Sequence, residues 1–281
     1  MKAFKNEDGR FGLYRPDKNI ERMNKSAVRL CMPEIPEDIF MEALKELVRM
    51  DSGWIPKGEL SSLYIRPVLF AVDEYIGVKA SETYRFVIFT CPVNGYYTKP
   101  VRVKVERHFT RAAQGGTGYA KAAGNYGGSL YPAKLANQQG YDQLLWTDAK
   151  EHKYIEESGT MNVMFVIDGK LLTPALGETI LDGITRDSVL TLARQWGMEV
   201  EERRVSVEEI LDALRSDRLT EAFGCGTAAT IAHIATIADG DEVFELPPVE
   251  NRELSNKLSK YFVDLKKFRI DDPNHWMIEL S

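Results

Sequence analysis

Cysteine is scarce in this chain, which has three among its 281 residues. Cys31, Cys91 and Cys225 lie far apart, and no two of them form a Cys-x-x-Cys pair. An odd number of isolated thiols argues against a disulfide framework and against a structural zinc site. The pattern is typical of a reducing compartment, and we expect the protein to lie in the cytoplasm.

Long apolar runs and an excess of positive charge are also missing. No stretch reaches the length of a membrane span, and the first residues contain no apolar signal core. The formal net charge of −6 argues against a general binder of nucleic acid or of acidic membranes. Hydrophobic residues make up 44% and charged residues 28%. This is the composition of an ordinary globular protein, long enough for two domains.

Several catalytic signatures are absent too. A P-loop needs glycine directly before its lysine and serine or threonine directly after it, but Lys121 lies between Ala120 and Ala122. No dinucleotide-binding Gly-x-Gly-x-x-Gly opens a helix, and neither Gly-x-Ser-x-Gly nor His-Glu-x-x-His occurs. The four histidines are isolated from one another. These absences argue against nucleotide hydrolysis, serine hydrolysis and zinc chemistry.

Helical and strand-like patterns alternate along the chain and predict mixed α and β structure in two lobes. Residues 92–100 are dense in proline, glycine and asparagine, which is typical of a linker. We therefore expect a small α/β domain over 1–94, an interdomain loop over 95–100 and a larger domain over 101–281. Asp17 is expected to cap the first helix, and a later helix is expected to begin near Ser129.

The most informative stretch is the glycine-rich run 115–128, which holds Lys121 between Tyr119 and Tyr126. Glycine is costly in a helix or a strand, so we expect a loop whose backbone can approach a flat ligand closely. A lysine in such a wall can lose its proton by desolvation and attack an aldehyde. Taken alone, however, the run fits a flexible surface loop with a solvated lysine better.

Three further motifs could bind charged groups. Residues 156–162 place Glu156 and Glu157 between apolar strands, where a buried carboxylate needs a charged or proton-donating partner; alone, a solvated turn is the better interpretation. The helix start at 181–186 suits a phosphate, although most helix N-termini bind nothing. The turn at 224–229 could hold an anion or be a simple hairpin turn.

Together these features match what pyridoxal phosphate requires. A lysine holds the aldehyde carbon, and a carboxylate keeps the pyridine nitrogen protonated so that the ring can act as an electron sink. The phosphate needs N–H donors and an arginine, and Arg22 on the first helix is either that ligand or a surface charge. The sequence therefore predicts pyridoxal 5′-phosphate as the cofactor and no metal.

Three motifs have a spacing that is specific. They are Gly-x-Gly-x-x-Lys-x-x-Gly-Asn-Tyr around Lys121, Glu-x-Gly-Thr-Met-Asn from Glu157, and Gly-x-Gly-Thr-Ala from Gly224. With the runs at 1–4, 62–67 and 142–146, they make the chain resemble, over essentially its whole length, the branched-chain aminotransferases of pyridoxal-phosphate fold type IV. The resemblance implies the mixed α+β or α/β fold of the D-amino-acid aminotransferase type, with a small N-terminal and a larger C-terminal domain.

The resemblance also implies a role for each matching residue. Lys121 would be the Schiff-base lysine and would carry the proton between the substrate Cα and the cofactor. Glu157 would pair with the pyridine nitrogen, and Tyr126 would contact the phenolic oxygen. The phosphate would be held by Arg22, Ile184, Thr185 and Thr227. The substrate would be held by Tyr64, Arg66, Tyr96, Thr160, Thr227 and Ala228.

The implied reaction is ping-pong transamination of leucine, isoleucine or valine with 2-oxoglutarate by a homodimer. Two other members of the fold, a D-amino-acid aminotransferase and an aminodeoxychorismate lyase, remain alternatives, although the Tyr-Ile-Arg-Pro run at 64–67 favours the branched-chain member. A non-catalytic homologue that binds cofactor or a partner subunit is the alternative from another class.

The chain departs from the family pattern in two places. Ala229 and Ala232 stand where some members carry Cys-x-x-Cys, so no thiol switch is expected. In the family, Met-Lys-Ala-Phe usually lies inside the protein, after a segment of several dozen residues that supplies small-domain strands and pocket aromatics. We expect a form that begins at Met1 to bind cofactor less well and to have an incomplete substrate pocket.

Overall fold

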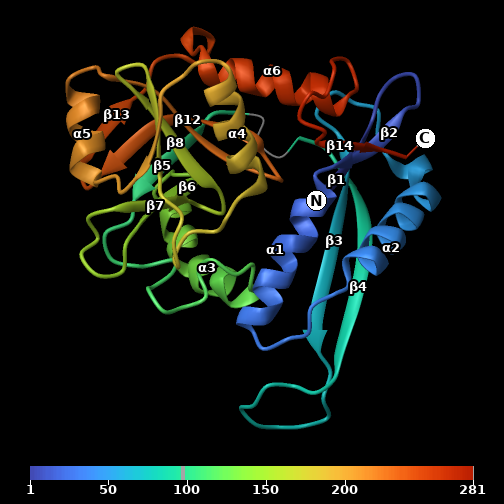
Figure 1. The fold of residues 1–281 in the computed structure, drawn as a ribbon. Helices are drawn as coiled ribbons and strands as arrows, with labels where there is room; N and C mark the ends of the chain where they lie inside the picture. The colour runs from blue at the N-terminus through green and yellow to red at the C-terminus, as the bar shows by residue number, and fades with distance from the viewer. Residues whose placement is uncertain (96–98, 281) are drawn as a thin grey trace. The chain divides into compact units, whose positions relative to one another are not determined.

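The computed structural model describes residues 1–95 and 99–280 (Figure 1). Contacts between residues divide the chain into two units, which are described separately. Unit 1 comprises Met1–Tyr96 and Tyr261–Ser281, and unit 2 comprises Tyr97–Lys260. The domain limits expected from the sequence stay a prediction, but the contacts group the residues after 260 with the first unit.

Among its described residues, unit 1 contains an antiparallel sheet in the order β14-β2-β1-β3-β4. The strands are β1 (Lys2–Lys5), β2 (Phe11–Tyr14), β3 (Ser62–Ala71), β4 (Tyr84–Val93) and β14 (Met277–Glu279). In β14, Ile278 lies opposite Leu13 of β2. This pairing explains why the C-terminal residues join the first unit and not the second.

Two helices share one apolar core with this sheet. They are α1 (Pro16–Arg29) and α2 (Glu37–Met50). Phe40, Leu44 and Val48 recur every fourth residue on α2 and are fully buried, as the helical period requires of a core-facing stripe. On β3, Leu63 and Ile65 alternate into the same core.

The start of α1 differs from the sequence expectation. The N-cap position belongs to Arg15, whose φ of 46° is left-handed, and Pro16 is the first helical residue. Proline is favoured there because its missing N–H would have no partner within the helix in any case. Asp17 lies in the first turn, where its charge favours the positive end of the helix, so its prediction as the cap was wrong.

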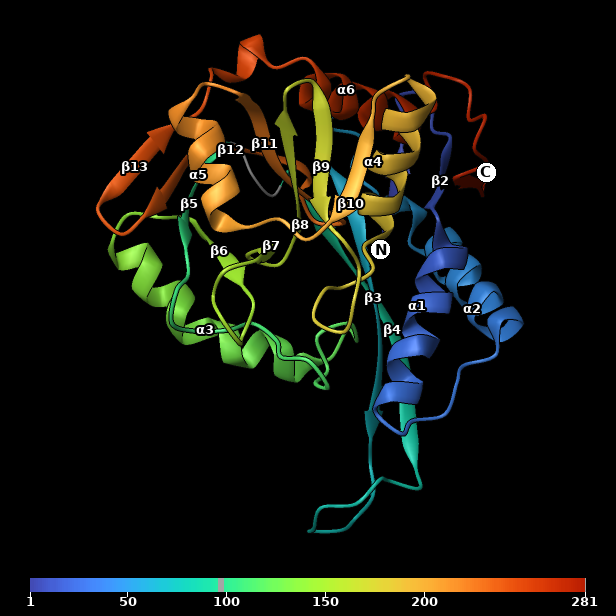
Figure 2. The same cartoon turned by 60° about the vertical axis from the view of Figure 1, so that its left-hand side comes forward.

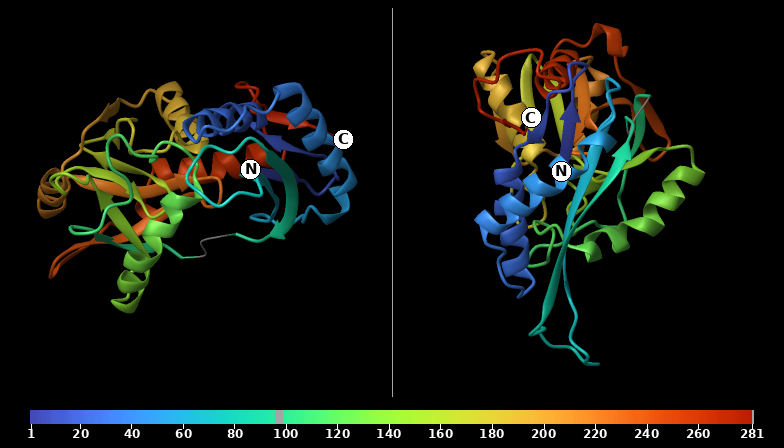
Figure 3. Two further views of the ribbon diagram at one scale, coloured as in Figure 1. Left: turned by 90° about the horizontal axis from the view of Figure 1, so that it is seen from below. Right: turned by 90° about the vertical axis from the view of Figure 1, so that its right-hand side faces the viewer.

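The strands β3 and β4 pair along their full length, from Ser62 opposite Val93 to Ala71 opposite Tyr84. They form a ribbon that extends past the ends of α1 and α2 (Figures 1 and 3). Large apolar side chains on the ribbon and on the loop that joins its strands are exposed to solvent. They are Phe70, Val72, Tyr75, Ile76, Val78, Val87 and Phe89.

Unit 2 contains a mixed sheet in the order β10-β9-β8-β11-β12-β5-β6-β7, with β13 paired to β12 (Figure 2). β5 runs parallel to both of its neighbours. The strands are β5 (Val101–Val105), β6 (Gln143–Thr147), β7 (Ile155–Ser158), β8 (Asn162–Ile167), β9 (Lys170–Pro174), β10 (Val200–Arg203), β11 (Leu219–Gly226), β12 (Thr230–Asp239) and β13 (Glu242–Glu245).

Helices are packed around this sheet (Figure 2). They are α3 (Ala123–Gln138), α4 (Ile184–Gln195), α5 (Val207–Arg215) and the first part of α6 (Leu254–Lys266). Buried strand residues such as Val163 and Phe165 share a core with Ile210 of α5. The hydroxyl of Ser206 caps α5 by accepting a hydrogen bond from the Glu209 N–H, which is the favoured way to satisfy a first-turn donor.

The helix α3 begins earlier than the sequence predicted. Gly124, Gly127 and Gly128 lie inside it, although we expected a loop there and a helix only from about Ser129. Each glycine disfavours a helix by about 1 kcal/mol. The side chain of Asn125 binds the preceding backbone, and such tertiary contacts outweigh the intrinsic preference. The glycine-rich loop therefore ends just after Lys121.

Candidate active site

Lys121 lies at the end of the glycine-rich loop of unit 2, where its amine meets a phenol. Lys121 Nζ donates a hydrogen bond to Tyr126 Oη over 2.5 Å. Asn125 Nδ2 donates to the carbonyl oxygens of Thr117 (2.8 Å) and Ala120 (2.9 Å). These bonds fix the backbone that leads to Lys121 against the first turn of α3.

The side chain of Lys121 is exposed, which differs from the sequence argument. That argument relied on desolvation of the amine by the glycine-rich wall. The protein atoms of the loop supply little burial because the glycines carry no side chains. The contact with the Tyr126 hydroxyl, and not burial by the loop, is what distinguishes this lysine in the structure.

Glu157 lies on β7 and is 2% exposed. Its Oε1 accepts a hydrogen bond from the Leu181 N–H (2.7 Å), and its Oε2 lies 2.9 Å from Arg111 Nε. Burial raises the pKa of the Glu157 carboxyl to about 7, while the charges of Arg111 and Lys121 lower it. The effect of Lys121 means that the amine and the acid share one electrostatic environment.

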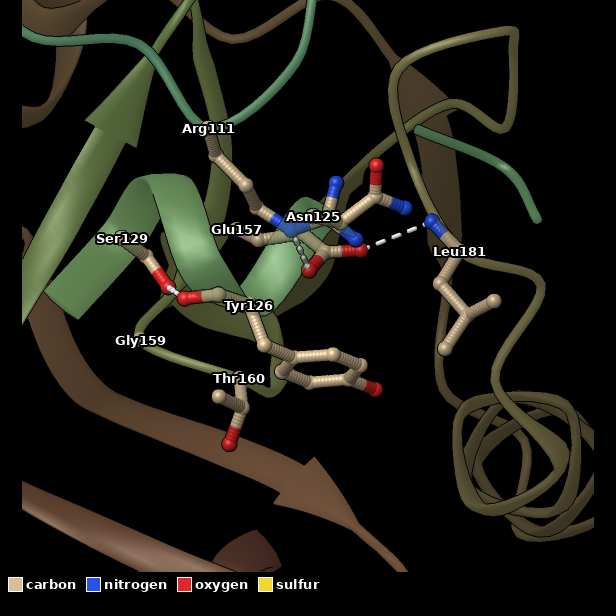
Figure 4. Close-up of a pocket in the computed structure, with 8 residues that line it drawn as sticks. All are labelled: Arg111, Asn125, Tyr126, Ser129, Glu157, Gly159, Thr160 and Leu181. Atoms are coloured by element: carbon tan, nitrogen blue, oxygen red, sulfur yellow. Dashed lines mark hydrogen bonds and ion pairs between the residues drawn. The ribbon is translucent and has the colours of Figure 1, made fainter. Parts of the chain in front are cut away.

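Figure 4 shows the pocket around this acid. Its lining comes from the segment between β5 and α3, from the start of α3, from β7 and the turn that follows it, and from the segment that leads to α4. The residues are Arg111, Asn125, Tyr126, Ser129, Glu157, Gly159, Thr160 and Leu181. Three of the sequence candidates, Tyr126, Glu157 and Thr160, are thus brought together in one cavity.

The helix α4 begins three residues after Leu181, whose N–H binds the acid. Gly183 is its N-cap, and Ile184 and Thr185 form the first turn, both buried. A Cβ on Gly183 would lie 1.9 Å from Asn162 Oδ1, so this close approach requires glycine. The first N–H groups of a helix have no partner within it, and they carry positive character that suits an anion.

The turn between β11 and β12 places Thr227 and Ala228 at its tip, and both are partly buried. The sequence analysis assigned residues 224–229 to the turn, but β11 continues to Gly226. The reason is that Gly224 packs directly on Met161, where a Cβ would lie 2.7 Å from Met161 Cε. Glycine here serves sheet packing, and the turn starts at Thr227.

Three further candidates lie in unit 1. Arg22 is on α1, and Tyr64 and Arg66 are on β3. Arg66 Nη2 donates to Tyr64 Oη over 3.2 Å, and its guanidinium lies 5.2 Å from the centre of the Tyr64 ring. Tyr96, a further candidate of the substrate pocket, lies outside the described residues.

The sequence analysis missed Arg111, whose side chain is 9% exposed and forms an ion pair with Glu157. No motif marked it, because a single arginine in Thr-Arg-Ala has no distinctive neighbours. Within the described part of the chain, no group of three or more histidine, cysteine or acidic residues could hold a metal ion. No helix of that part is long and apolar enough to cross a membrane.

Comparison with known proteins agrees with this geometry. Residues 3–237 match the family model described as amino-transferase class IV. The chain belongs to the class IV aminotransferases. Two curated members of that family are the branched-chain-amino-acid aminotransferase 2 and transaminase 1 of Bacillus subtilis (strain 168), with 44% and 43% identity over 284 residues. These alignments cover 100% of this chain and 78% and 80% of the relatives.

Solved class IV structures resemble the chain over its whole length. The branched-chain aminotransferase of Thermoproteus uzoniensis with norvaline has a TM-score of 0.84 and 26% identity, and the enzyme of Escherichia coli has 0.80 and 25%. Each covers 100% of this chain and 88% of the other. The predicted mixed fold and family are confirmed.

The cofactor prediction is confirmed as well, because class IV aminotransferases use pyridoxal 5′-phosphate. One neighbour, the branched-chain aminotransferase of Thermobaculum terrenum, was solved in its PLP form, with a TM-score of 0.78 and 26% identity over 100% of this chain and 87% of that one. The roles of individual residues stay predictions.

Proposed function

We propose that this chain transfers the α-amino group of branched-chain L-amino acids to 2-oxoglutarate with pyridoxal 5′-phosphate as cofactor. One observation inside unit 2 carries the proposal. The Lys121 amine is hydrogen-bonded to the Tyr126 phenol, and its charge lowers the pKa of the buried Glu157 carboxyl. The names of relatives with 44% identity, all branched-chain aminotransferases, support the substrate class.

The groups that line the pocket, together with the Lys121 amine beside Tyr126 and the start of α4, fit pyridoxal phosphate. An amine suits the aldehyde, a phenol suits the ring oxygen, a buried acid suits the ring nitrogen, and the start of α4 suits the phosphate. When bound, the cofactor supplies a carbonyl that takes up the amino group and a ring that accepts the electrons released at the substrate Cα.

The candidate residues of unit 2 would each have a distinct role in the reaction. The amine of Lys121 would take the proton from the substrate Cα and return it, since a neutral amine is a general base. Tyr126, bonded to that amine, would hold it in place. Glu157 would keep the ring nitrogen protonated. Ile184 and Thr185 would offer their N–H groups to the phosphate, which the α4 dipole favours.

The remaining assignments are proposals supported by the family resemblance. Arg22 and Thr227 would bind the phosphate, and Thr160, Thr227 and Ala228 the substrate. The Tyr64–Arg66 pair in unit 1, with Tyr96, would line the side-chain pocket. The ring would contact apolar side chains, and the guanidinium would pair with the second carboxylate of glutamate, so that one pocket could serve both substrates.

One spectrum tests the function. The purified full chain is mixed with pyridoxal phosphate, and its visible absorbance is recorded before and after addition of L-leucine. We expect an absorbance band from the bound cofactor. L-leucine alone should shift this band in stoichiometric amount, and addition of 2-oxoglutarate should restore it. Rates on D-alanine and aminodeoxychorismate provide the comparison with the other members of the fold. A faster reaction with either compound than with L-leucine would refute the branched-chain assignment.

We further propose that the chain works as a homodimer in the cytoplasm, with a small domain over 1–94, a loop over 95–100 and a larger domain over 101–281. The exposed apolar side chains of the β3–β4 ribbon support a protein interface, because monomeric surfaces rarely expose large apolar patches. The sparse, isolated cysteines support a reducing compartment.

A further inference from the structure

The guanidinium of Arg111 binds three separate segments of unit 2. Its Nε lies 2.9 Å from Glu157 Oε2. Its Nη1 donates to the carbonyl oxygen of Thr179 (2.6 Å), and its Nη2 donates to that of Gly118 (3.2 Å). All three nitrogens are therefore engaged, each with a different part of the chain.

These three segments are the ones that carry the proposed cofactor contacts. Gly118 lies three residues before Lys121, Thr179 lies on the segment that leads to α4, and Glu157 is the acid itself. Figure 4 shows Arg111 and Glu157 joined beside Leu181 at the same pocket. A single side chain thus connects the amine loop, the acid and the approach to the helix that would bind the phosphate.

Additional contacts hold the two loops together. The N–H of Gly115 donates to Glu178 Oε2 (2.9 Å), and the N–H of Tyr119 donates to the Glu178 carbonyl oxygen (3.0 Å). A Cβ on Gly118 would lie 2.7 Å from Thr179 Cα, so the backbones are in direct contact. Arg111 lies over this contact and bonds to a carbonyl on each side of it.

Arg111 also balances an unfavourable charge. Glu157 is buried beside a second buried acid, Glu156, whose charge raises the pKa of Glu157 as burial does. The groups that favour its ionised form are Arg111, the Leu181 N–H and Lys121, with Asn162 Nδ2 at 3.5 Å from Oε1. Among the described cations that affect it, Arg111 has the larger effect, because it is in direct contact.

We propose that Arg111 is a positioning residue that favours the ionised form of Glu157, directs this acid into the pocket, and sets the spacing between the lysine loop and the approach to α4. The inference rests on the proposed function, since it concerns the acid that would face the cofactor ring. Arg111 itself would act through Glu157 and the two loops and not on the substrate.

The test uses the full chain after its bound cofactor has been removed. It compares the binding of pyridoxal phosphate with that of its 1-deaza analogue, in which a C–H group replaces the ring nitrogen. Dissociation constants are measured by fluorescence quenching. Only pyridoxal phosphate can form a charge-assisted bond with an ionised Glu157, and such bonds are about twice as strong as neutral ones. We expect wild type to prefer pyridoxal phosphate by about ten-fold or more.

In Arg111→Met we expect most of this preference to be lost, because the acid takes up a proton. In wild type the preference should also fall as the pH drops and Glu157 becomes neutral, and in Arg111→Met that fall should begin at a higher pH. In Arg111→Lys the charge remains, so the preference should persist. Both affinities should still weaken, because an ammonium cannot reach three separate acceptors.

The control is Arg218→Met, which removes an exposed arginine paired with Asp168 in the same unit. It should leave both constants unchanged. A purely structural role for Arg111 would weaken both cofactors equally and leave their ratio at the wild-type value, which would overturn the proposal. If Arg111→Met does not fold, Arg111→Gln, which keeps a neutral donor, is measured with the same two outcomes.

The two hypotheses fail in different ways. Wild type that binds neither cofactor and leaves L-leucine unchanged would refute the proposed function. Wild type that binds pyridoxal phosphate and reacts with L-leucine, together with Arg111 variants that keep the wild-type ratio and its pH dependence, would overturn the role of Arg111 alone.

Discussion

In unit 2 an exposed amine, hydrogen-bonded to the pocket residue Tyr126, accompanies a buried acid that lines the pocket itself. Lys121 keeps contact with solvent and with Tyr126, whereas Glu157 depends on Arg111 and on one backbone N–H. Substitution of Lys121 therefore tests its proposed role in the reaction and should have little effect on folding. Substitution of the acid changes the electrostatic free energy of the protein itself.

Lys121→Ala should abolish turnover of L-leucine and leave no cofactor bond that borohydride can reduce, because the substitution removes the amine that would form that bond. Activity and mass after borohydride treatment are the measurements. Lys134→Ala, which removes an exposed lysine from α3, is the control and should keep both. Full activity in Lys121→Ala would exclude the assigned role.

Glu157→Gln should change how stability depends on pH. The pKa of the acid is raised in the folded state, to about 7 from an ordinary 4.5, so the folded protein holds a proton that the unfolded chain has lost. Between these values the wild-type cofactor-free protein loses stability as the pH rises. The glutamine variant lacks this loss and should gain roughly 1–3 kcal/mol relative to wild type between pH 4.5 and 7.5.

Urea unfolding of both cofactor-free proteins across this pH range measures the difference. Glu250→Gln, at an exposed position, provides the matched control and should run parallel to wild type. A Glu157→Gln curve that also stays parallel to wild type would show that folding does not raise the pKa of this acid.

At this scale, the sequence indicated residues whose neighbours are distinctive. Lys121 and Glu157 each lie beside glycines in motifs of fixed spacing, so the resemblance could assign them. Arg111 could not be found in this way, because its importance comes from three contacts that only the folded chain brings together. The exposure of Lys121 agrees with the interpretation of the glycine-rich run taken alone, as a loop with a solvated lysine.

Elements show a similar contrast between local pattern and tertiary contact. The helices α2 and α5 each carry several buried apolar residues along their length. The early start of α3, in contrast, depends on Asn125 reaching back to Thr117 and Ala120. Intrinsic preference therefore predicts helices with an apolar stripe, and it fails where a polar side chain fixes a glycine-rich turn.

Two glycines near Lys121 should respond in opposite ways to a methyl group. In Gly118→Ala the Cβ would meet Thr179 Cα at 2.7 Å, so the two loops must separate and affinity for pyridoxal phosphate should fall by about ten-fold or more. Gly127→Ala lies inside α3 with nothing within 4 Å of the new Cβ. It should stabilise the protein by about 0.5–1 kcal/mol.

Thermal unfolding and cofactor titration of both variants are the measurements. Equal cofactor affinity in Gly118→Ala and wild type would show that the close approach of the two loops has no importance for the site. Destabilisation by Gly127→Ala would contradict the helical assignment of this glycine.

The C-terminal part of α6 carries a buried lysine. Lys266 is 6% exposed and lies against the rings of Phe4, Tyr14 and Phe262. Burial, aided by the charge of Lys2, lowers its pKa to about 7. The unfolded chain holds a proton up to an ordinary pKa near 10.5, so wild-type stability should rise as the pH increases from about 7 towards 10.

Lys266→Met should remove this rise and should stabilise the protein by roughly 1–3 kcal/mol at pH 6.5, with a smaller gain at pH 9. Melting temperatures at the two values measure the effect, and Lys260→Met, at an exposed position of the same helix, serves as the control. A gain that does not shrink at the higher pH would mean that the lysine stays charged in the folded protein.

For the whole molecule, the exposed ribbon side chains lead to a prediction about assembly. If the apolar β3–β4 ribbon forms part of a homodimer interface, Val78→Glu should shift the protein towards the monomer, because a charge cannot be buried there without a partner. Light scattering coupled to gel filtration measures the mass, against 31.8 kDa for one chain. Lys79→Glu, next in sequence, should have a weaker effect. A monomeric wild type would refute the proposed dimer.

The division of the chain into units was only partly predictable at this scale. A linker rich in proline and glycine indicated where the first unit is left, but no local signal indicated that the chain returns to it. That return depends on the pairing of β14 with β2, which joins residues more than two hundred positions apart in a strand of three residues. A strand of three residues is too short to show a periodic pattern of apolar residues in the sequence.

The same pairing sets an order of events during synthesis. Unit 2 is one continuous stretch, so it can fold as soon as it has left the ribosome. The sheet of unit 1 must wait for β14, which is translated near the end. The half that would bind the cofactor can therefore be in place while β2 still presents an unpaired edge. A chain that ends at residue 270 and has been released from the ribosome should keep a unit 2 that resists protease, whereas β2, without β14, should be cleaved more readily.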